Sequence, residues 1–199
     1  MKHDSAKLRA TLRTVVRSYI ANWRPISQAE LVWYRDLESL DGAIECAALA
    51  MNSKRKRHPH QYRLKRAALE EARQLLLHSS RLISQTKNFE GILALVGGLV
   101  RDIRGLGELY TYDTSLRIGA HRKLFPKAVY LHSGTREGAR ALGLDWNGKK
   151  LEVAAFPVEL QALKPFEIED VLCLYRDHFV GRSTLPMSRG CGQPRGCRS

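Results

Sequence analysis

The sequence has no long hydrophobic run. Its longest apolar stretch, Ile92 to Val100, is about half of the roughly 20 residues that a membrane-crossing helix needs. An N-terminal secretory signal is also missing, because residues 1–13 are polar and basic and no apolar run follows them. From these two absences we expect no membrane partner and a location in the cytoplasm.

Cysteine is scarce and does not cluster. Cys46 and Cys173 stand among apolar residues of expected helices, which is typical of buried small hydrophobic side chains. Cys191 and Cys197 are separated by five residues of a Gly/Arg/Ser-rich tail, where oxidation would allow them to pair. A structural zinc site usually needs two closely spaced ligand pairs. We therefore expect no metal site.

Acidic residues are too few to balance the basic ones. The 199 residues include 33 Lys and Arg against 20 Asp and Glu, which gives a formal net charge of +13. Such an excess excludes an acidic scaffold and favours a polyanionic partner such as nucleic acid. Hydrophobic residues make up 44% and charged residues 27%, a balance typical of a folded domain rather than a disordered chain.

Alternation of strands and helices is also missing, and helical periodicity covers most of the chain instead. Proline, glycine and polar clusters separate the periodic segments. The sequence therefore predicts a mainly α fold, a multi-helix bundle. The expected helices cover residues 5–23, 27–48, 64–86, 89–103, 109–120, 133–142, 157–163 and 166–175, with extended segments at 128–131 and 151–153.

Three parts are expected along the chain. Residues 1–63 hold the N-terminal helices and a basic connector, and residues 64–180 form a helical domain. Residues 181–199 form a basic tail rich in Gly, Arg, Ser and Pro, in which periodicity stops. This composition predicts disorder in the tail.

A short glycine bend lies between two expected helices. It reads Arg104-Gly105-Leu106-Gly107-Glu108. Glycine adopts positive φ at little cost and lets another molecule approach the backbone closely. The amides of the bend, with the N-terminus of the following helix, are suited to hold a phosphate, and we expect Leu106 to pack between the two helices. A plain turn within a bundle is the alternative interpretation.

Downstream of the bend, Val129-Tyr130-Leu131-His132 leads into a helix that carries Arg136 and Arg140 and ends near Leu142-Gly143. Over about 45 residues this order resembles the helix-hairpin-helix DNA glycosylase superfamily. The resemblance implies a glycosylase-like helical fold whose helix-hairpin-helix motif grips the DNA backbone without reading bases. It also implies that carbonyl groups of the bend hold a monovalent cation, as in some family members. No other cofactor is expected.

The chemistry of that family does not carry over. Tyr130 stands where the family has its catalytic aspartate, and Leu109 stands where the bifunctional members have a lysine. A tyrosine phenol is un-ionised at neutral pH, so it would not stabilise a sugar cation as a carboxylate does. The cysteines do not supply the four thiolates of an iron–sulfur cluster. We therefore expect no standard glycosylase centre, and we favour a nucleic-acid-binding protein over an enzyme.

An altered catalytic centre is the second hypothesis. Asp113 and His132 are the candidate acid/base groups, and Tyr130 would line a base-binding site. Each has a structural alternative: an ion pair or hydrogen bond for Asp113, a helix cap or packing role for His132, and core packing for Tyr130. Tyr110 and Tyr112 have the same two readings, base stacking or core. Such an enzyme would be glycosylase- or lyase-like.

A basic segment covers residues 54–66, which contain seven Lys or Arg and no acidic residue. This composition favours phosphate binding, and a solvated loop is the alternative. His58 and His60 have no evident further metal ligands. Other basic residues, among them Arg101 and Arg117, flank the bend. The candidate nucleic-acid contacts are Arg104, Gly105, Leu106, Gly107, Glu108, Lys54, Arg55, Lys56, Arg57 and Arg63.

The leading hypothesis is a protein that binds nucleic acid, DNA before RNA, through its phosphates. The second is the nucleic-acid-processing enzyme described above. The third is a helical module whose bend contacts another protein. The sequence gives no indication of the oligomeric state.

Overall fold

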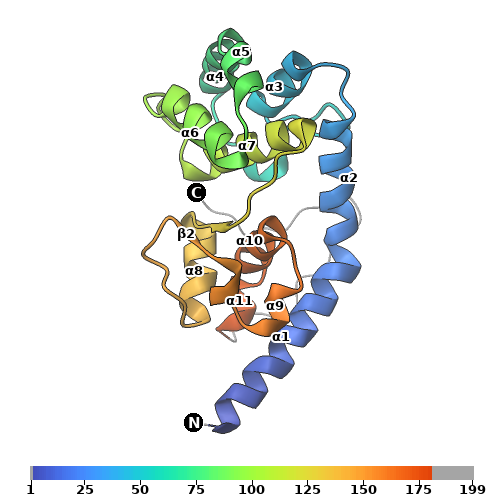
Figure 1. The fold of residues 1–199 in the computed structure, drawn as a ribbon, viewed down its shortest axis with the longest axis vertical. Coiled ribbons are helices and arrows are strands. Elements are labelled where there is room, and N and C mark those ends of the chain that lie inside the picture. The colour runs from blue at the N-terminus through green and yellow to red at the C-terminus, as the bar shows by residue number, and fades with distance from the viewer. Residues whose placement is uncertain (1, 181–199) are drawn as a thin grey trace. The chain divides into compact units, whose positions relative to one another are not determined.

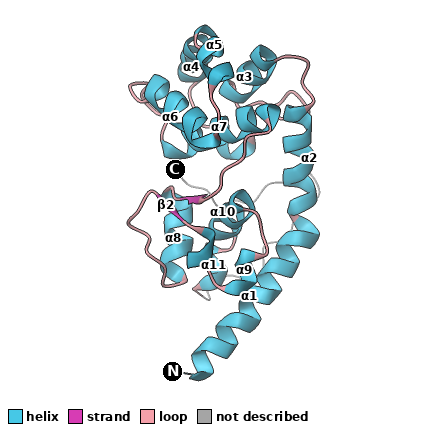
Figure 2. Cartoon of the chain, in the orientation of Figure 1, coloured by secondary structure: helices cyan, strands magenta, loops and turns pink. Residues whose placement is uncertain are grey.

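A computed structural model of the chain describes residues 2–180, and the side chains of residues 6–180. The fold is mainly helical, which confirms the fold class predicted from the sequence (Figure 2). The predicted disordered tail, with Cys191 and Cys197, lies outside the described residues. No helix within residues 2–180 combines the length and the apolar character needed to cross a bilayer.

The helices follow one another with connections of different lengths, and the longest of these cover residues 49–65 and 142–157 (Figure 1). A small antiparallel sheet pairs β1 (Val129–Tyr130) with β2 (Lys150–Leu151), and short 3-10 turns cover Pro59–Gln61 and Val153–Ala155. In chain order the α-helices are α1 (Lys2–Asn22), α2 (Arg24–Arg35), α3 (Leu40–Ala48), α4 (Arg66–His78), α5 (Ser80–Gln85), α6 (Phe89–Val100), α7 (Glu108–Arg122), α8 (Ser133–Ala141), α9 (Val158–Gln161), α10 (Pro165–Leu174) and α11 (Arg176–Phe179).

Two of the expected helices are each divided into two. The helix predicted over 27–48 stops at Arg35, and α3 starts after Ser39, whose side chain accepts a hydrogen bond of 3.1 Å from the amide of Gly42. A serine in this position satisfies one of the unpaired amides at a helix start. The helix predicted over 64–86 is divided at Ser79.

Residues 2–180 form two compact units. Unit 2 is the continuous segment Gln28–Pro126, and unit 1 combines the described residues up to Ser27 with those from Lys127 onward. This division does not follow the boundary expected after residue 63. Residues 28–63 belong with the helices that follow them, because α3 packs against α4 and α7. Ile44 of α3, for example, shares a core with Leu76 and Ile118.

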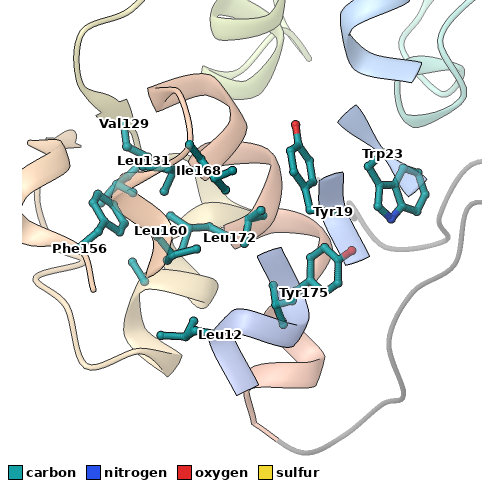
Figure 3. Close-up of a cluster of buried hydrophobic side chains, with 14 residues drawn as sticks. Leu12, Tyr19, Trp23, Val129, Leu131, Phe156, Leu160, Ile168, Leu172 and Tyr175 are labelled. Atoms are coloured by element: carbon teal, nitrogen blue, oxygen red, sulfur yellow. The ribbon is translucent and has the colours of Figure 1, made fainter. Parts of the chain in front are cut away.

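The core of unit 1 joins the two ends of the described chain (Figure 3). Leu12 and Tyr19 on α1 are fully buried in the same cluster as Leu172 and Tyr175 at the end of α10. Leu12, Val15 and Tyr19 follow one another at helical spacing, so a single stripe of α1 enters this core. The apolar stripe thus positions α1 against α10.

Acidic side chains on α10 hold α1 and the first residue of α2 within unit 1. Both carboxylate oxygens of Glu167 accept hydrogen bonds from Arg24, at 2.7 and 2.9 Å, and the Glu167 side chain is only 2% exposed. Asp170 accepts a hydrogen bond of 2.7 Å from the hydroxyl of Tyr19. Acidic residues at the start of a helix interact favourably with the positive end of its dipole, and Glu167 and Asp170 each also have a specific distant partner.

Among the glycines of unit 1 that the structure describes, Gly138 of α8 lies closest to the backbone of another helix. A Cβ placed on Gly138 would lie 2.2 Å from the carbonyl oxygen of Leu172, so α8 and α10 meet backbone to backbone. The sequence also holds two glycines inside α6, Gly97 and Gly98, and glycines within a helix predict close packing against a neighbouring helix. At Gly97 a Cβ would meet Thr111 at 3.3 Å, and at Gly98 it would meet no atom within 4 Å. That expectation is wrong for Gly98, which faces solvent.

We expect the substitution Gly98→Ala to stabilise the protein by about 0.5–1 kcal/mol, because alanine loses less backbone entropy than glycine in a helix. Gly98 lies inside α6 with open space where a Cβ would be placed. Urea denaturation of the variant and the wild-type chain measures the change. A loss of stability would contradict the open surroundings of this residue.

Candidate functional site

The bend between α6 and α7 follows the pattern expected from the sequence. Gly105 has a φ of +97°, a conformation that side chains rarely allow. Gly107 has extended backbone angles and directly precedes the first residue of α7. Between them, Leu106 is 7% exposed and packs with Ile103 and Tyr110. Leu106 therefore anchors the bend while the two glycines stay at the surface.

The amides of the two glycines are open. Gly105 and Gly107 are both exposed, and a Cβ at either would meet no atom within 4 Å. Within residues 2–180, neither amide donates a hydrogen bond to a protein group. Gly107 also gives α7 no side-chain cap. Gly105 and Gly107 thus present unused donors to solvent just before the positive end of the dipole of this 15-residue helix.

Part of the basic segment is attached to the bend by a hydrophobic cluster. Leu64 packs against the hydrophobic cluster that contains Leu69 of α4, Ile103 and, from the bend, Leu106. Exposed basic residues flank both sides of this cluster in the sequence. They are Arg63, Lys65 and Arg66 next to Leu64, and Arg101 and Arg104 next to Ile103. The bend and the end of the basic segment therefore belong to one region of unit 2.

The beginning of the basic segment is a tight turn. The side chain of Asn52 accepts hydrogen bonds from the amides of Lys54, at 2.9 Å, and Lys56, at 3.1 Å. Arg55, at the tip, has a left-handed φ of 57°. The side chains of Lys54, Arg55 and Lys56 are exposed. The turn holds three cationic side chains at the surface of unit 2.

The side chain of Arg57 binds to the backbone of the segment itself. Its guanidinium donates hydrogen bonds to the carbonyl oxygens of Tyr62, at 3.2 Å, and Leu64, at 2.9 Å. These bonds hold the backbone from residue 57 to residue 64 in a closed loop. Arg57, included among the candidate phosphate contacts, thus contributes to the shape of the segment.

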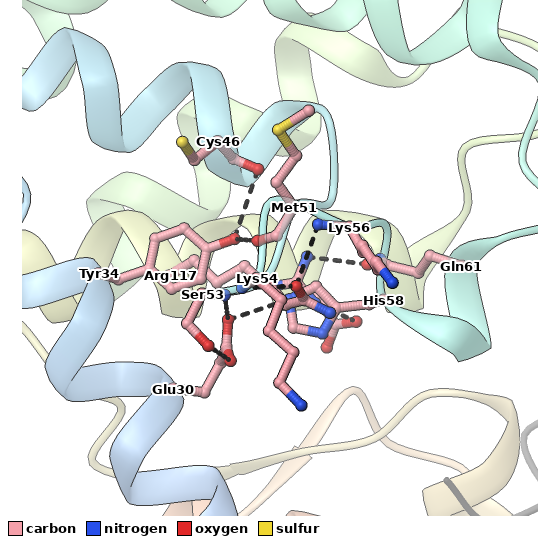
Figure 4. A network of polar contacts seen from close by, with 12 residues as sticks. Glu30, Tyr34, Cys46, Met51, Ser53, Lys54, Lys56, His58, Gln61 and Arg117 are labelled. Carbon is pink, nitrogen blue, oxygen red and sulfur yellow. Dashed lines mark hydrogen bonds and ion pairs between the residues drawn. The ribbon is translucent and has the colours of Figure 1, made fainter. Parts of the chain in front are cut away.

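A network of polar side chains fastens the basic segment to α2 and α7 (Figure 4). Nε2 of His60 lies 2.7 Å from a carboxylate oxygen of Asp113, and Arg117 donates a 2.8 Å hydrogen bond to the side chain of Gln61. Glu30 of α2 accepts a hydrogen bond of 3.2 Å from the amide of Ser53. Contacts from two helices therefore fix the backbone just before the segment, at Ser53, and the middle of the segment, at His60 and Gln61.

Two members of this network, Arg117 and His58, add no positive charge to the surface of the segment. Arg117, expected among the basic residues around the bend, is 6% exposed and lies within 3.5 Å of Asp113, because its place on α7 faces the interior of unit 2. His58 is buried, and burial together with the Arg117 charge lowers its pKa to about 2. His58 is therefore neutral at neutral pH and adds no positive charge to the segment.

The candidate catalytic residues lie in different units. Asp113 belongs to unit 2 and takes part in the network with His60 and Arg117. His132 belongs to unit 1, is 3% exposed and has its Nε2 next to Glu169, while its amide donates to the Thr135 hydroxyl at the start of α8. Tyr130 is a half-buried residue of β1, paired with β2. Asp113 and His132 thus have the contacts of structural residues.

The tyrosines considered for base stacking on α7 are buried. Tyr110 and Tyr112 are each 3% exposed, and the hydroxyl of Tyr110 donates to the carbonyl of Ala48 at 2.9 Å. Burial raises the pKa of Tyr110 to about 12. These rings belong to the core of unit 2 and have no face available to a base.

Among the described residues, no three His, Cys, Asp or Glu side chains gather in a way suited to a metal ion. Comparisons of the chain with models of known protein families, with curated proteins and with solved structures gave no match. The geometry of unit 2 is therefore the basis of the functional conclusion.

Proposed function

We propose that the protein binds nucleic acid through its phosphates, at the bend between α6 and α7 and along the basic segment of residues 54–66. The observation that carries the proposal is the pair of open amides at Gly105 and Gly107, located at the start of α7. Backbone donors at a helix N-terminus favour an anion, since the helix dipole adds to their hydrogen bonds.

The surroundings of the bend support the same proposal. Arg101 and Arg104 precede the glycines, and Arg63, Lys65 and Arg66 flank the leucine that packs against the bend. These side chains suit a run of phosphates better than a single small anion. The net charge of +13 adds long-range attraction for a polyanion. DNA is the first candidate, because the bend resembles a motif that grips the DNA backbone.

Fluorescence anisotropy with a labelled DNA duplex tests the proposal. We expect binding near 50 mM salt and an affinity that falls steeply as salt rises, with about 0.9 in the log–log slope for each phosphate neutralised. A folded chain that binds neither this duplex nor a single strand of the same sequence at about this salt concentration contradicts the proposal.

The substitution Gly107→Asp is expected to weaken DNA binding by about 10- to 100-fold, the equivalent of losing one charge-assisted hydrogen bond. An aspartate at the residue before α7 would accept hydrogen bonds from the first amides of the helix, and its charge would repel a phosphate. The fold should not suffer, because Gly107 has an ordinary extended conformation with open space around it. Anisotropy titrations and urea denaturation measure the two effects.

Gly107→Asn is the matched control. Asparagine caps a helix about as well as aspartate but carries no charge, so it should weaken binding less than aspartate does. Equal, unchanged affinity in both variants would place the phosphate elsewhere on the protein and contradict the role given to the bend.

A further inference from the structure

Tyr62 is the aromatic side chain that the basic segment exposes. It is 60% exposed, the largest value among the large hydrophobic residues of unit 2, whereas Tyr110 and Tyr112 are buried. Three basic residues follow it closely, namely Arg63, Lys65 and Arg66. An exposed ring of this kind contributes little to the stability of the fold, since stabilisation by burial follows the area removed from water.

The backbone of Tyr62 is fixed on both sides. Gln61, immediately before it, is 3% exposed and bonded to Arg117, and Leu64, two residues later, packs in the cluster of the bend. The carbonyl of Tyr62 itself accepts a hydrogen bond from Arg57 at 3.2 Å. The ring is therefore presented from a rigid support, so little conformational entropy would be lost when a ligand covers it.

Arg63 holds the ring from one side. Its Nε donates a hydrogen bond of 3.0 Å to the Tyr62 hydroxyl, and its guanidinium carbon lies 5.5 Å from the centre of the ring. This contact keeps a positive charge next to an aromatic surface. Proteins that bind single-stranded nucleic acids combine positive charges, which hold the phosphate backbone, with aromatic rings, on which the bases stack.

We propose that Tyr62 stacks on an unpaired base, so that the protein prefers single-stranded or locally unpaired nucleic acid to a fully paired duplex. The inference rests on the proposed function, because the bend and the basic side chains would hold the phosphates on either side of the stacked nucleotide. A fully paired duplex offers only its grooves and its phosphates along its length, since each internal base is covered by its neighbours. Leu64 connects the ring to the bend through the cluster it shares with Leu106.

Two oligonucleotides of equal length and charge separate stacking from phosphate binding. One is oligothymidine, and the other has the same sugar–phosphate backbone with abasic sites in place of every base. For the substitution Tyr62→Ala we expect oligothymidine binding to weaken by roughly 5- to 150-fold, the range that base–aromatic stacking provides. Binding of the abasic strand should change by less than about twofold, because its phosphates are still held by the same cations.

Tyr62→Phe is the matched control, because it keeps the ring and removes the hydroxyl that binds Arg63. It should retain most of the difference between the two oligonucleotides. A Tyr62→Ala variant that weakens both strands equally, or neither, overturns the stacking inference. If Gly107→Asp still weakens the binding of both oligonucleotides in that case, the proposal of phosphate binding at the bend remains supported without the stacking inference. If the wild-type chain binds neither strand nor duplex, both proposals fail.

Discussion

The substitution Gly138→Ala is expected to lower the free energy of unfolding by about 3 kcal/mol, at the upper end of what overpacking costs in a core. A Cβ at Gly138 would lie 2.2 Å from the carbonyl oxygen of Leu172 and 2.9 Å from its Cα. Both are backbone atoms of α10, so no side-chain rotation relieves the contact. Helix α8 would have to move away from α10, and Ala139, fully buried in the same core, would lose contacts with it.

Urea denaturation measures this loss, with Gly98→Ala as the matched control. Both substitutions add one methyl group to a glycine inside a helix, but Gly98 has open space around it. The expected effects therefore have opposite signs. A Gly138→Ala variant as stable as the wild type would show that α8 and α10 do not meet as closely as described.

The second large effect is expected for Arg24→Met, which should cost about 3 kcal/mol of stability, because a buried charge without its partner is costly. Arg24 donates two hydrogen bonds to the carboxylate of Glu167, whose side chain is 2% exposed. Methionine has a similar length and keeps the apolar contacts of the arginine stem. The loss therefore reports the unpaired carboxylate rather than a missing side chain.

The double variant Arg24→Met/Glu167→Met shows whether the unpaired carboxylate or the missing arginine side chain causes the loss of stability. Replacing both members of a buried ion pair by apolar residues is often close to neutral, so the double variant should recover most of the stability lost in Arg24→Met. Arg35→Met serves as a second control: Arg35 is 47% exposed and its partner Asp36 is 58% exposed, and exposed pairs contribute little. A double variant no more stable than Arg24→Met would show that the unpaired carboxylate of Glu167 does not cause the loss.

Local signals in the sequence predict most of the helices and the bend. The apolar stripes define α1, α6 and α10 to within a few residues, and the two glycines around Leu106 indicate the turn between α6 and α7. Such features depend on residues that are close in sequence. The exposure of Tyr62 likewise follows from its position in a basic, non-periodic segment.

Features that depend on distant residues were not predictable in this way. The pairing of Arg24 with Glu167 joins residues 143 positions apart, and the burial of Arg117 depends on Gln61, 56 positions away. The choice of Gly138 rather than Gly98 as the contact glycine depends on where α10 packs. The division into two units likewise has no marker in composition, since residues 27 and 28 lie within one helix, α2.

The two parts of unit 1 lie at opposite ends of the described chain. During synthesis, unit 1 therefore cannot assemble until its second part has been made. Tyr19 and its partner Asp170 are 151 positions apart, which at ribosomal rates of about 5–20 residues per second means a delay of roughly 8–30 s. Throughout that interval the growing polypeptide carries Leu12, Val15 and Tyr19 without the apolar surface that later covers them. Helix α1 is thus open to premature association during that interval, and a ribosome-bound chaperone would be expected to shield it.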